Sequence, residues 1–376
     1  MTNKKICMLS SVHPAFDTRI FYKEAKTLSM AGYNVTLIAR NNKNEIMDGI
    51  NIIALPKPKN RFTRIFYITW KIFKLALNQR ADIYHFHDPE LIFVGIFLRI
   101  FGKKVIYDVH EDVPEQILSK DYIPKFLKKL ISISFRVFEN HSSKAFSFVI
   151  TATDDLRCKF FKYTSNVVEV KNYISMEYAE KGDARKKDNY NRLRMIFVGG
   201  IYIERGIIEG IKAMNLLPEL SLKFILYGPV NNKFLLELKN LDELGRLEYQ
   251  GIIPYTQVIN RLKKADVGFI CDYPLKRHIE GLPVKLFEYM AAGLPLIASN
   301  FPLWRQIVEK YNCGICVEPT KPKEIAIAIR YLYENPKIGN QMGQNGRKAI
   351  LGEYNWERES KKLLDVYSKI LGDNNV

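Results

Sequence analysis

Short apolar runs alternate with longer amphipathic stretches along the whole chain. The runs in the first half are Ile6–Leu9, Val35–Ala39, Ile50–Leu55, Ile83–Phe86, Val105–Val109 and Phe146–Thr151. Those in the second half are Met195–Val198, Leu222–Tyr227, Leu247–Tyr249, Val267–Cys271, Leu296–Ala298 and Ile315–Val317. Short β-rich runs separated by helix-length segments are typical of parallel strands joined by crossover helices. The pattern therefore predicts an α/β protein with doubly wound sheets, which bind ligands at the carboxyl ends of their strands.

The alternation pauses at the charged segment Lys181–Arg194, which contains few apolar residues. We interpret it as an interdomain linker, since 376 residues are about right for two domains. The predicted domains are residues 1–180 and residues 190–355. Beyond them, Trp356–Leu371 has the pattern of an amphipathic helix, and we expect residues 356–376 to cross back and pack on the first domain.

The composition favours a soluble globular protein, with 47% hydrophobic and 26% charged residues. The five cysteines are scattered and odd in number, which argues against a disulfide framework and favours a reducing cytoplasm. The CxxC of Cys313 and Cys316 has no second pair nearby, so we interpret it as two ordinary thiols. The most apolar window, Leu91–Phe101, is about half the length that spans a bilayer, and the apolar start of the chain is too short for a signal peptide. We therefore expect no transmembrane segment.

A net charge of +17 favours anionic partners, which include nucleic acid, phosphorylated small molecules and acidic membrane surfaces. Two segments, Arg61–Arg80 and Tyr122–Arg136, are both basic and apolar. Each could be an ordinary crossover helix packed on the sheet, and each could also lie on an anionic membrane. No sequence motif of a nucleic-acid-binding module is present, so we expect that nucleic acid is not the partner. We expect a cytoplasmic protein that is peripheral on the inner face of the membrane.

The strongest candidate site is the segment RHIEGLPVKLFEYMAAGLPLIAS, which begins at Arg277. Its prolines and glycines predict a helix that begins near Pro283 and ends near Gly293. Lys285 then lies in the first turn, where free backbone N–H groups and the helix dipole favour an anion. Glu288 follows three residues later on the same helix face and could accept hydrogen bonds from two sugar hydroxyls. An exposed Lys–Glu pair on a surface helix would have the same spacing.

The spacing E-x7-E from Glu280 to Glu288, followed by YMAAGLPLIAS, resembles the donor-site signature of the family 4 retaining glycosyltransferases. The resemblance covers most of the chain and implies the GT-B fold, with two Rossmann-like domains facing a central cleft. It implies that Glu288 binds the ribose of a nucleotide and that Glu280 lies beside the transferred sugar. The backbone amides of Gly281 and Leu282 would meet the sugar and phosphates, and Lys285 would face the phosphates, as in the subgroup with P-x-K-x-x-E-Y.

A second element, VGGIYIERG from Val198, places glycines directly after a strand and an arginine before a helix. Arg205 alone could simply cap that helix. The family pattern G-x-x-x-x-K/R-G implies instead that Gly199 and Gly200 approach the donor and that Arg205 binds its diphosphate. In the same family the backbone recognises the base, here around Gly228 and Gly251.

A third group of candidates lies in the first half of the chain. The resemblance assigns His110, in the stretch YDVHED, to the donor sugar. Glu111, and His13 and Arg19 in HPAFDTR, are candidates for contacts with the acceptor, although a salt bridge between Arg19 and Asp17 would explain that arginine equally well. His85 and His87 share one face of a strand and could bind a metal. No third ligand group is evident from the sequence, so we predict no metal site and an acceptor-side role for His87.

These features predict a retaining, metal-independent hexosyltransferase without a cofactor. The donor would be a UDP- or GDP-sugar and the acceptor a glycan or lipid-linked sugar, in cell-surface polysaccharide or lipopolysaccharide synthesis. The chain contains no D-x-D, the metal-holding motif of the other large glycosyltransferase fold. The alternatives are an epimerase-like GT-B enzyme, a phosphorylase, a glycosidase that uses Glu280 and Glu288, and a non-enzymatic protein that binds anions or nucleic acid.

Overall fold

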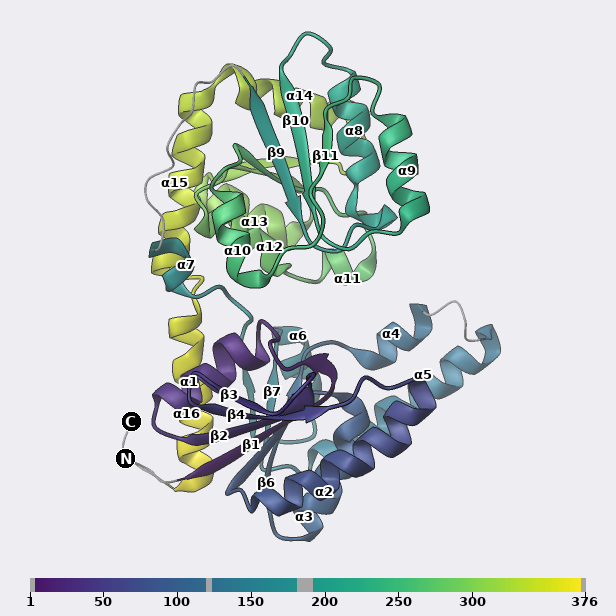
Figure 1. Cartoon of the computed structure of the whole chain (residues 1–376), viewed down its shortest axis with the longest axis vertical. Coiled ribbons are helices and arrows are strands. Elements are labelled where there is room, and N and C mark those ends of the chain that lie inside the picture. The colour runs from purple at the N-terminus through teal and green to yellow at the C-terminus, as the bar shows by residue number, and fades with distance from the viewer. Residues whose placement is uncertain (1–3, 120–123, 181–191, 373–376) are drawn as a thin grey trace. The chain divides into compact units, whose positions relative to one another are not determined.

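The computed structural model describes residues 4–119, 124–180 and 192–372. The chain divides into two compact units (Figure 1). The first unit contains Met1–Asn172 together with Arg358–Val376, and the second contains Tyr173–Glu357. Most of the predicted linker Lys181–Arg194 lies outside the described residues. None of the helices described is both long enough and apolar enough to cross a bilayer.

The first unit is built on an eight-stranded sheet in the order β3-β4-β2-β1-β5-β6-β7-β8. The described strands are β1 (Lys5–Pro14), β2 (Asn34–Arg40), β3 (Glu45–Met47), β4 (Ile50–Leu55), β5 (Ile83–Phe86), β6 (Lys104–Val109), β7 (Phe148–Thr151) and β8 (Val167–Glu169). Neighbours run parallel except for β3, which pairs with β4 as an antiparallel hairpin. Polar groups at the ends of β1, β5 and β6 therefore meet at one edge of the sheet.

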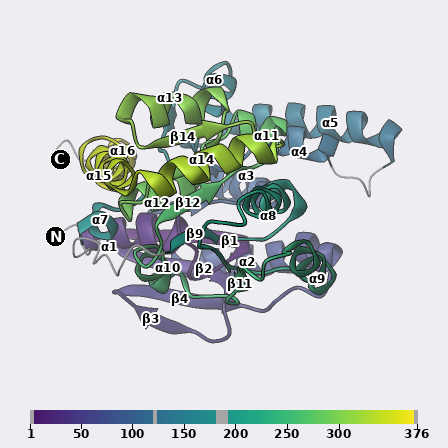
Figure 2. The same ribbon diagram turned by 90° about the horizontal axis from the view of Figure 1, so that it is seen from above.

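Helices lie on both faces of the first sheet, which Figure 1 shows from the side and Figure 2 from above. They are the π-helical turn η1 (Ile20–Ala25) leading into α1 (Lys26–Met30), η2 (Thr63–Ile68) leading into α2 (Thr69–Gln79), the short turn η3 (Pro89–Leu91) leading into α3 (Ile92–Ile100), α4 (Val113–Ser119), α5 (Lys125–Ser143) and α6 (Asp154–Phe161). Apolar residues of α2, α3 and α6 form one core with alternate residues of β1, β5 and β6. Period-two alternation explains why each strand contributes side chains to both faces.

The second unit has a six-stranded, wholly parallel sheet in the order β11-β10-β9-β12-β13-β14. The strands are β9 (Leu193–Val198), β10 (Leu222–Tyr227), β11 (Leu247–Tyr249), β12 (Val267–Ile270), β13 (Leu296–Ser299) and β14 (Gly314–Val317). The order in which the strands follow one another is that of a dinucleotide-binding doubly wound fold, with the direction of winding reversing between β9 and β12. Ligands of such sheets bind outside the carboxyl ends of the strands at this reversal.

The helices of the second unit are α7 (Met176–Glu180), α8 (Ile207–Asn215), α9 (Asn232–Leu241), α10 (Tyr255–Leu262), α11 (Lys276–Ile279), α12 (Val284–Ala291), α13 (Pro302–Tyr311), α14 (Pro322–Glu334) and α15 (Pro336–Gly352). Residues of α8, α9 and α14 fill the core on one face of the sheet, and residues of α10, α12, α13 and α15 fill the other. Within β9, Met195 and Phe197 face the first core while Ile196 and Val198 face the second.

The last helix, α16 (Trp356–Leu371), belongs mainly to the first unit. Its residues Leu363, Val366 and Tyr367 are buried, and Lys104 Nζ of β6 donates to the Ile370 carbonyl at 2.6 Å. The predicted C-terminal helix, including its return to the first domain, is therefore confirmed.

Candidate functional site

Three glycines follow the carboxyl ends of three adjacent strands in the second unit. Gly199, Gly228 and Gly251 come after β9, β10 and β11 and have φ angles of +138°, +137° and +79°. The Gly228 N–H donates to the Gly251 carbonyl at 2.8 Å, and a Cβ on Gly228 would lie 1.9 Å from the Gly199 carbonyl oxygen. A side chain is thus excluded at Gly228 and disfavoured by the positive φ at all three positions, and the bare backbone at this edge allows close approach of a ligand.

Arg205 lies at the same edge, in the short turn η4 (Ile203–Arg205) that leads into α8. Its guanidinium pairs with the buried carboxylate of Asp272, two residues beyond the end of β12, and does not cap the helix. Gly206, at φ +64°, allows the turn to lie close to β12, because a Cβ at this position would be only 2.0 Å from the Cys271 carbonyl oxygen. Asp272 was missed from the sequence, although its place after a strand is the kind of position that holds functional residues.

Helix α12 begins after Pro283 and is followed by Gly293 at φ +71°, as predicted. No side chain caps its first turn, so backbone N–H groups remain available there. The Lys285 side chain lies across Gly199, since a Cβ on that glycine would be 2.4 Å from Lys285 Cε. Its Nζ is 5.2 Å from the centroid of the Phe197 ring.

The charge of Lys285 is opposed by its surroundings. Burial lowers the pKa of Lys285, and the neighbouring cation Arg205 lowers it further. The carboxylates of Asp272 and Glu288 raise it, but by less. Two cations in one partly buried place are stabilised by an anionic ligand. The structure therefore brings Arg205, Lys285 and the first turn of α12 together as a candidate anion site.

The two glutamates of the predicted motif differ in their surroundings. Glu288 is 9% exposed and lies on α12 three residues after Lys285. Glu280 is exposed at the end of the four-residue helix α11. The carbonyl of Gly281 accepts a hydrogen bond from Trp304 Nε1 at 2.6 Å, and Leu282 packs against the core. Both residues are thus fixed, whereas the Glu280 carboxylate lies in solvent.

Two further residues of this region are now placed. Gly200, beside Gly199, has the Tyr202 ring against it, with 2.4 Å from a built Cβ to the nearest ring carbon. His278 is only 7% exposed, and its Nδ1 lies 2.9 Å from the Tyr273 carbonyl oxygen. Burial lowers the pKa of His278, and the Tyr273 contact opposes this change.

The first unit contains a buried polar cluster under the ends of β1, β5 and β6. The Arg19 guanidinium donates to Asp108 through Nη2 at 3.0 Å and to the Val170 carbonyl at 2.9 Å, and its Nε lies 2.7 Å from Glu24 Oε1. Arg19 is 2% exposed, so it does not fit the predicted acceptor contact. The predicted salt bridge to Asp17 was also wrong, because the guanidinium pairs with Asp108 and Glu24. The Arg19 group that donates to Asp17 is its backbone N–H.

The histidines of this cluster converge on Asp108. His87 Nδ1 and His110 Nε2 each lie 3.4 Å from Asp108 Oδ2 and 3.3 Å from one another. Burial would raise the pKa of Asp108, but Arg19 and His110 hold it well below its usual range. The His110 side chain is 20% exposed and can reach a ligand, whereas His87 is 2% exposed and lies beneath it. An acceptor contact for His87 is therefore a poor fit.

His13 and Glu111 lie at the surface above the cluster. His13 Nδ1 is 3.3 Å from Asp17 Oδ2, and its Nε2 is 3.5 Å from Asp88 Oδ1. Burial opposes the charge of His13, but the bond to Asp17 and the Asp88 carboxylate together raise its pKa. Glu111 is exposed. Both side chains are thus accessible, as their predicted acceptor role requires.

The expectation that His85 and His87 lack a third ligand group is corrected by the structure. Glu24 and Asp108 lie beside them, and one ligand atom from each of the four residues is within 4.8 Å of the others. Asp108 is two residues before His110 and so lies on the same face of the extended chain, and this spacing could have indicated it from the sequence. Glu24 comes from the π-helical turn η1, about 60 residues earlier, and had no local signal.

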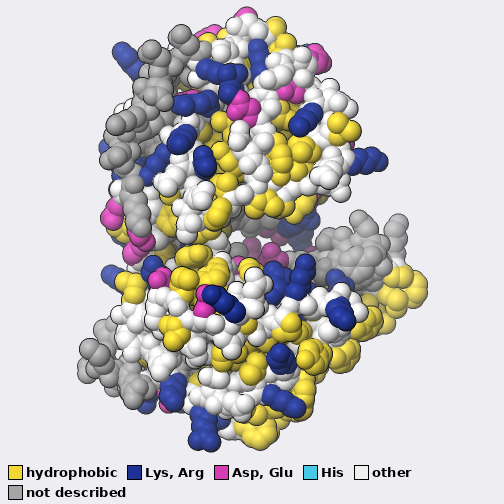
Figure 3. Space-filling model, viewed as in Figure 1, with side chains coloured by type: hydrophobic (Ala, Val, Ile, Leu, Met, Phe, Trp, Pro, Cys, Tyr) yellow, Lys and Arg dark blue, Asp and Glu magenta, His cyan; other side chains and the backbone are white. Residues whose placement is uncertain are grey.

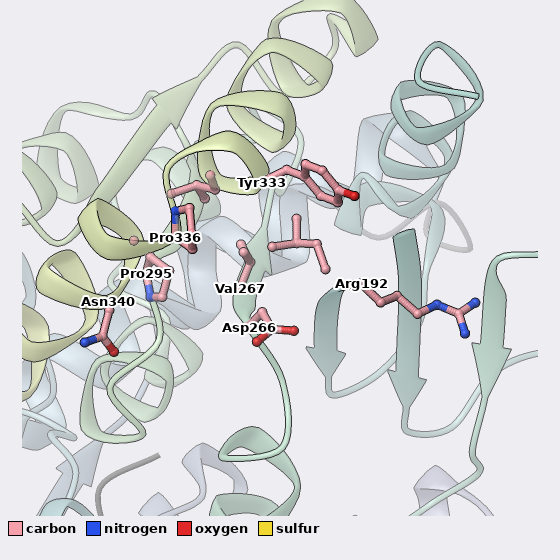
Figure 4. Close-up of a pocket in the computed structure, with 10 residues that line it drawn as sticks. Arg192, Asp266, Val267, Pro295, Tyr333, Pro336 and Asn340 are labelled. Atoms are coloured by element: carbon pink, nitrogen blue, oxygen red, sulfur yellow. The ribbon is translucent and has the colours of Figure 1, made fainter. Parts of the chain in front are cut away.

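A small cavity lies at the opposite, amino-terminal edge of the second sheet (Figure 4). Its volume is about 90 Å³, below the roughly 300 Å³ at which ligand pockets begin. The lining residues are Arg192, Leu193, Asp266, Val267, Pro295, Leu332, Tyr333, Pro336, Gly339 and Asn340. Asp266 is already paired with Arg194 at 2.9 Å. This cavity is too small for a nucleotide-sugar.

Comparisons with known proteins agree along the chain. Residues 180–349 match the family model of the glycosyl transferases group 1, and residues 18–170 match that of Glycosyltransferase Family 4. An uncharacterized glycosyltransferase of Methanocaldococcus jannaschii is 24% identical over 323 residues, which are 83% of this chain and 79% of that relative.

Solved structures share the whole fold. WaaG, a glycosyltransferase involved in lipopolysaccharide biosynthesis, has a TM-score of 0.72 and 14% identity over 96% of this chain and 99% of its own. HepE of Anabaena, solved in complex with UDP and glucose, has a TM-score of 0.70 and 14% identity over 97% of this chain and 100% of its own.

Proposed function

Since this chain is a glycosyltransferase of the GT-B type, we propose that it transfers a hexose from a UDP- or GDP-sugar with retention at the anomeric carbon. The observation that carries the proposal is the anion site of Arg205, Lys285 and the first turn of α12, beside three side-chain-free strand ends. A nucleoside diphosphate has the charge for this site and a flat base for the bare backbone. The UDP bound by HepE supports the choice of donor.

In the proposed reaction the donor diphosphate leaves as negative charge builds on it. Arg205, Lys285 and the α12 amides stabilise that charge, so no metal ion is required at the diphosphate. Glu288 accepts hydrogen bonds from the ribose hydroxyls, and the amides of Gly281 and Leu282 hold the sugar side. His110 stays the predicted contact of the transferred sugar, and the departing diphosphate takes the acceptor proton. Glu280, whose carboxylate is exposed, stays the predicted neighbour of the transferred sugar.

A thermal-shift panel of UDP, GDP, CMP and their sugars tests the donor assignment. We expect UDP or GDP to raise the melting temperature of the wild type. Glu288→Ala should weaken that nucleotide about 10- to 100-fold, since a hydrogen bond involving a charged group is worth about 1.5–3 kcal/mol. Glu309→Ala, at an exposed position of α13 in the same unit, is the matched control. Unchanged affinity in Glu288→Ala would remove Glu288 from the site.

We further propose that the acceptor is lipid-linked and that the first unit docks on an anionic membrane at the cytoplasmic face. Large apolar side chains are exposed along η2, α2, α3 and α5, and we call this surface the aromatic face (Figure 3). Its members include Phe62, Phe66, Trp70, Phe93, Phe97, Phe126 and Leu130. The ring centroids of Phe93 and Phe138 are 4.7 Å apart and join α3 to α5, and those of Phe97 and Phe73 are 5.8 Å apart and join α3 to α2. The helices therefore present one continuous surface.

The exposed fractions are high for a surface that stays in water: 70% for Phe66 and 78% for Phe126. Basic residues border it, among them Lys74, whose Nζ lies 5.3 Å from the Trp70 ring, and the exposed Lys129. Apolar side chains edged by lysines are typical of monotopic binding to anionic lipid. The work of WaaG in lipopolysaccharide synthesis supports a place in the synthesis of a cell-surface glycan.

Vesicle sedimentation tests the docking proposal. The wild type should cosediment with vesicles that contain phosphatidylglycerol and less with phosphatidylcholine alone. The triple change Phe66→Ser, Phe97→Ser and Phe126→Ser should abolish cosedimentation. The control is the pair Ile252→Ser and Ile327→Ser, which removes apolar side chains that are 71% and 69% exposed in the second unit. Equal binding of the triple variant and the control would rule out the aromatic face as the docking surface.

A further inference from the structure

Four side chains with metal-ligand chemistry converge inside the first unit. Glu24 comes from η1, His85 from β5, His87 directly after it, and Asp108 from β6. Each is at most 2% exposed. One ligand atom of each lies within 4.8 Å of the other three. We call these four residues the buried tetrad.

Arg19 donates to both oxygens of Asp108, but two other atoms that a cation would need are free of hydrogen bonds. Among the residues that the structure describes, His85 Nε2 and Glu24 Oε2 have no hydrogen-bond partner, although both are buried. The other nitrogen of His85, Nδ1, lies 2.8 Å from the Tyr367 hydroxyl. That bond orients the ring and leaves Nε2 directed to the interior of the tetrad, 3.8 Å from Asp108 Oδ2. Metal-binding histidines are commonly held in this way by their second nitrogen.

The charges of the tetrad are incompletely balanced by the protein. The Arg19 guanidinium reaches Asp108 and lies 2.7 Å from Glu24 Oε1, so one cation faces two carboxyl groups. Glu24 Oε2 stays outside that contact. His110, the other basic group of the cluster, lies against Asp108. A cation bound beside Glu24 Oε2 would give this buried oxygen a partner, and a proton on Glu24 is the competing solution.

The spacing suits a small divalent ion. His87 Nδ1 lies 3.4 Å from Asp108 Oδ2 and 3.7 Å from Glu24 Oε2. Tetrahedral bonds of about 2.0–2.1 Å to zinc would place ligand atoms roughly 3.3 Å apart. Two imidazole nitrogens and two carboxylate oxygens form a donor set that suits zinc and its neighbours better than magnesium or calcium.

We propose that the buried tetrad of Glu24, His85, His87 and Asp108 binds one divalent transition-metal ion of the zinc type. The ion would join η1, β5 and β6 at the carboxyl edge of the first sheet. It would also lie next to His110, whose Nε2 is 3.4 Å from Asp108 Oδ2, and so would fix the groups that orient this histidine. The ion is a structural and positioning element, independent of the diphosphate site in the second unit.

Metal analysis of the full-length chain tests the proposal. Protein stripped with a chelator and reloaded with Zn²⁺ should retain one equivalent after gel filtration. Loading with Co²⁺ should produce the visible absorption of a four-coordinate N/O site. His85→Gln and His87→Gln should weaken Zn²⁺ at least about 100-fold, whereas His141→Gln, an exposed histidine of α5, should bind like the wild type.

A wild type that retains no Zn²⁺ or Co²⁺ would overturn the proposal and leave the proton on Glu24 as the solution. Equal retention by His85→Gln and His141→Gln would also overturn it, because the ion would then lie elsewhere. If the histidine variants fail to fold, Glu24→Gln decides, since it keeps the side-chain shape and removes one ligand. Zn²⁺ should raise the melting temperature of the wild type and of His141→Gln but not that of Glu24→Gln.

Discussion

Lys285 illustrates how a binding residue can reduce the stability of the empty protein. Burial and Arg205 lower its pKa from the usual 10.5, so the folded state binds this proton less tightly than the unfolded state. Below both pKa values Lys285 is charged in both states, and the folded state bears the full free-energy cost of burying that charge. The cost falls as the pH rises through the folded pKa and reaches its minimum above the unfolded one.

Lys285→Met should therefore raise the free energy of unfolding at pH 7, and this gain should shrink at pH 10. The same variant should weaken the donor nucleotide about 10- to 100-fold, because a contact between charged groups is lost. Urea unfolding at the two pH values, with calorimetric titration of UDP and GDP, measures both effects. Lys264→Met, at an exposed position of the same unit, should change neither quantity. A destabilised Lys285→Met would mean that Asp272 and Glu288 outweigh burial.

Residue-level prediction succeeded where local spacing decided the geometry. The three-residue interval between Lys285 and Glu288 was sufficient to predict a shared helix face, and α12 has that face. The prediction for the partner of Arg19 was wrong because Asp108 lies 89 positions away in the sequence, whereas Asp17 is a nearby carboxylate. A guanidinium reaches several acceptors, and the choice among them depends on tertiary contacts that no sequence interval records.

At the scale of elements, two glycines of α15 differ in what surrounds them. A Cβ on Gly343 would lie 1.9 Å from the Gly293 carbonyl oxygen after α12, whereas one on Gly339 would meet Leu332 and Pro295 at 3.5 and 3.7 Å. Gly343→Ala should force the two helices apart and destabilise the second unit by about 1–3 kcal/mol. Gly339→Ala should stabilise it by about 0.5–1 kcal/mol, since alanine reduces the entropy of the unfolded chain.

Denaturant unfolding of the two variants measures the difference directly. Both changes replace a buried glycine by alanine on the same helix, so the effect of alanine on helix propensity is the same in the two variants. Gly343→Ala should also weaken the donor nucleotide, because α12 carries Lys285 and Glu288. Equal stabilisation by both alanines would mean that α15 moves away from α12 without cost, contrary to the close packing here.

The apolar runs predicted most strands but not the irregular elements. Strands β3 and β8 were missed; each is three residues long and partly exposed, so it shows no alternation long enough to predict a strand. The π-helical turn η1 was also missed, since it has no periodic signature separate from an α-helix. Yet η1 carries Glu24 into the buried tetrad. The part of the first unit that the sequence could not predict is therefore the part that shapes its polar centre.

At the scale of the whole molecule, the order of the strands determines where a ligand can bind. Both sheets reverse their winding direction once, between β1 and β5 and between β9 and β12, and place polar loops at that carboxyl edge. The alternation of apolar runs was sufficient to predict two such sheets. The return of α16 to the first unit followed from its amphipathic pattern, whereas most of the predicted linker lies outside the described residues.

The two edges of the second sheet make opposite predictions for the donor. If the nucleotide binds at the carboxyl edge, UDP or GDP should slow amide exchange in peptides that cover residues 198–206 and 280–288. Peptides over residues 335–341, beside the amino-edge cavity, should exchange at the same rate with and without nucleotide. Hydrogen exchange followed by mass spectrometry on the full chain measures both edges in one sample. Glu288→Ala should lose the protection of the carboxyl edge at a nucleotide concentration that saturates the wild type. Protection that centres on residues 335–341 would place the donor at the amino edge instead, and the anion site of Arg205 and Lys285 would need another ligand.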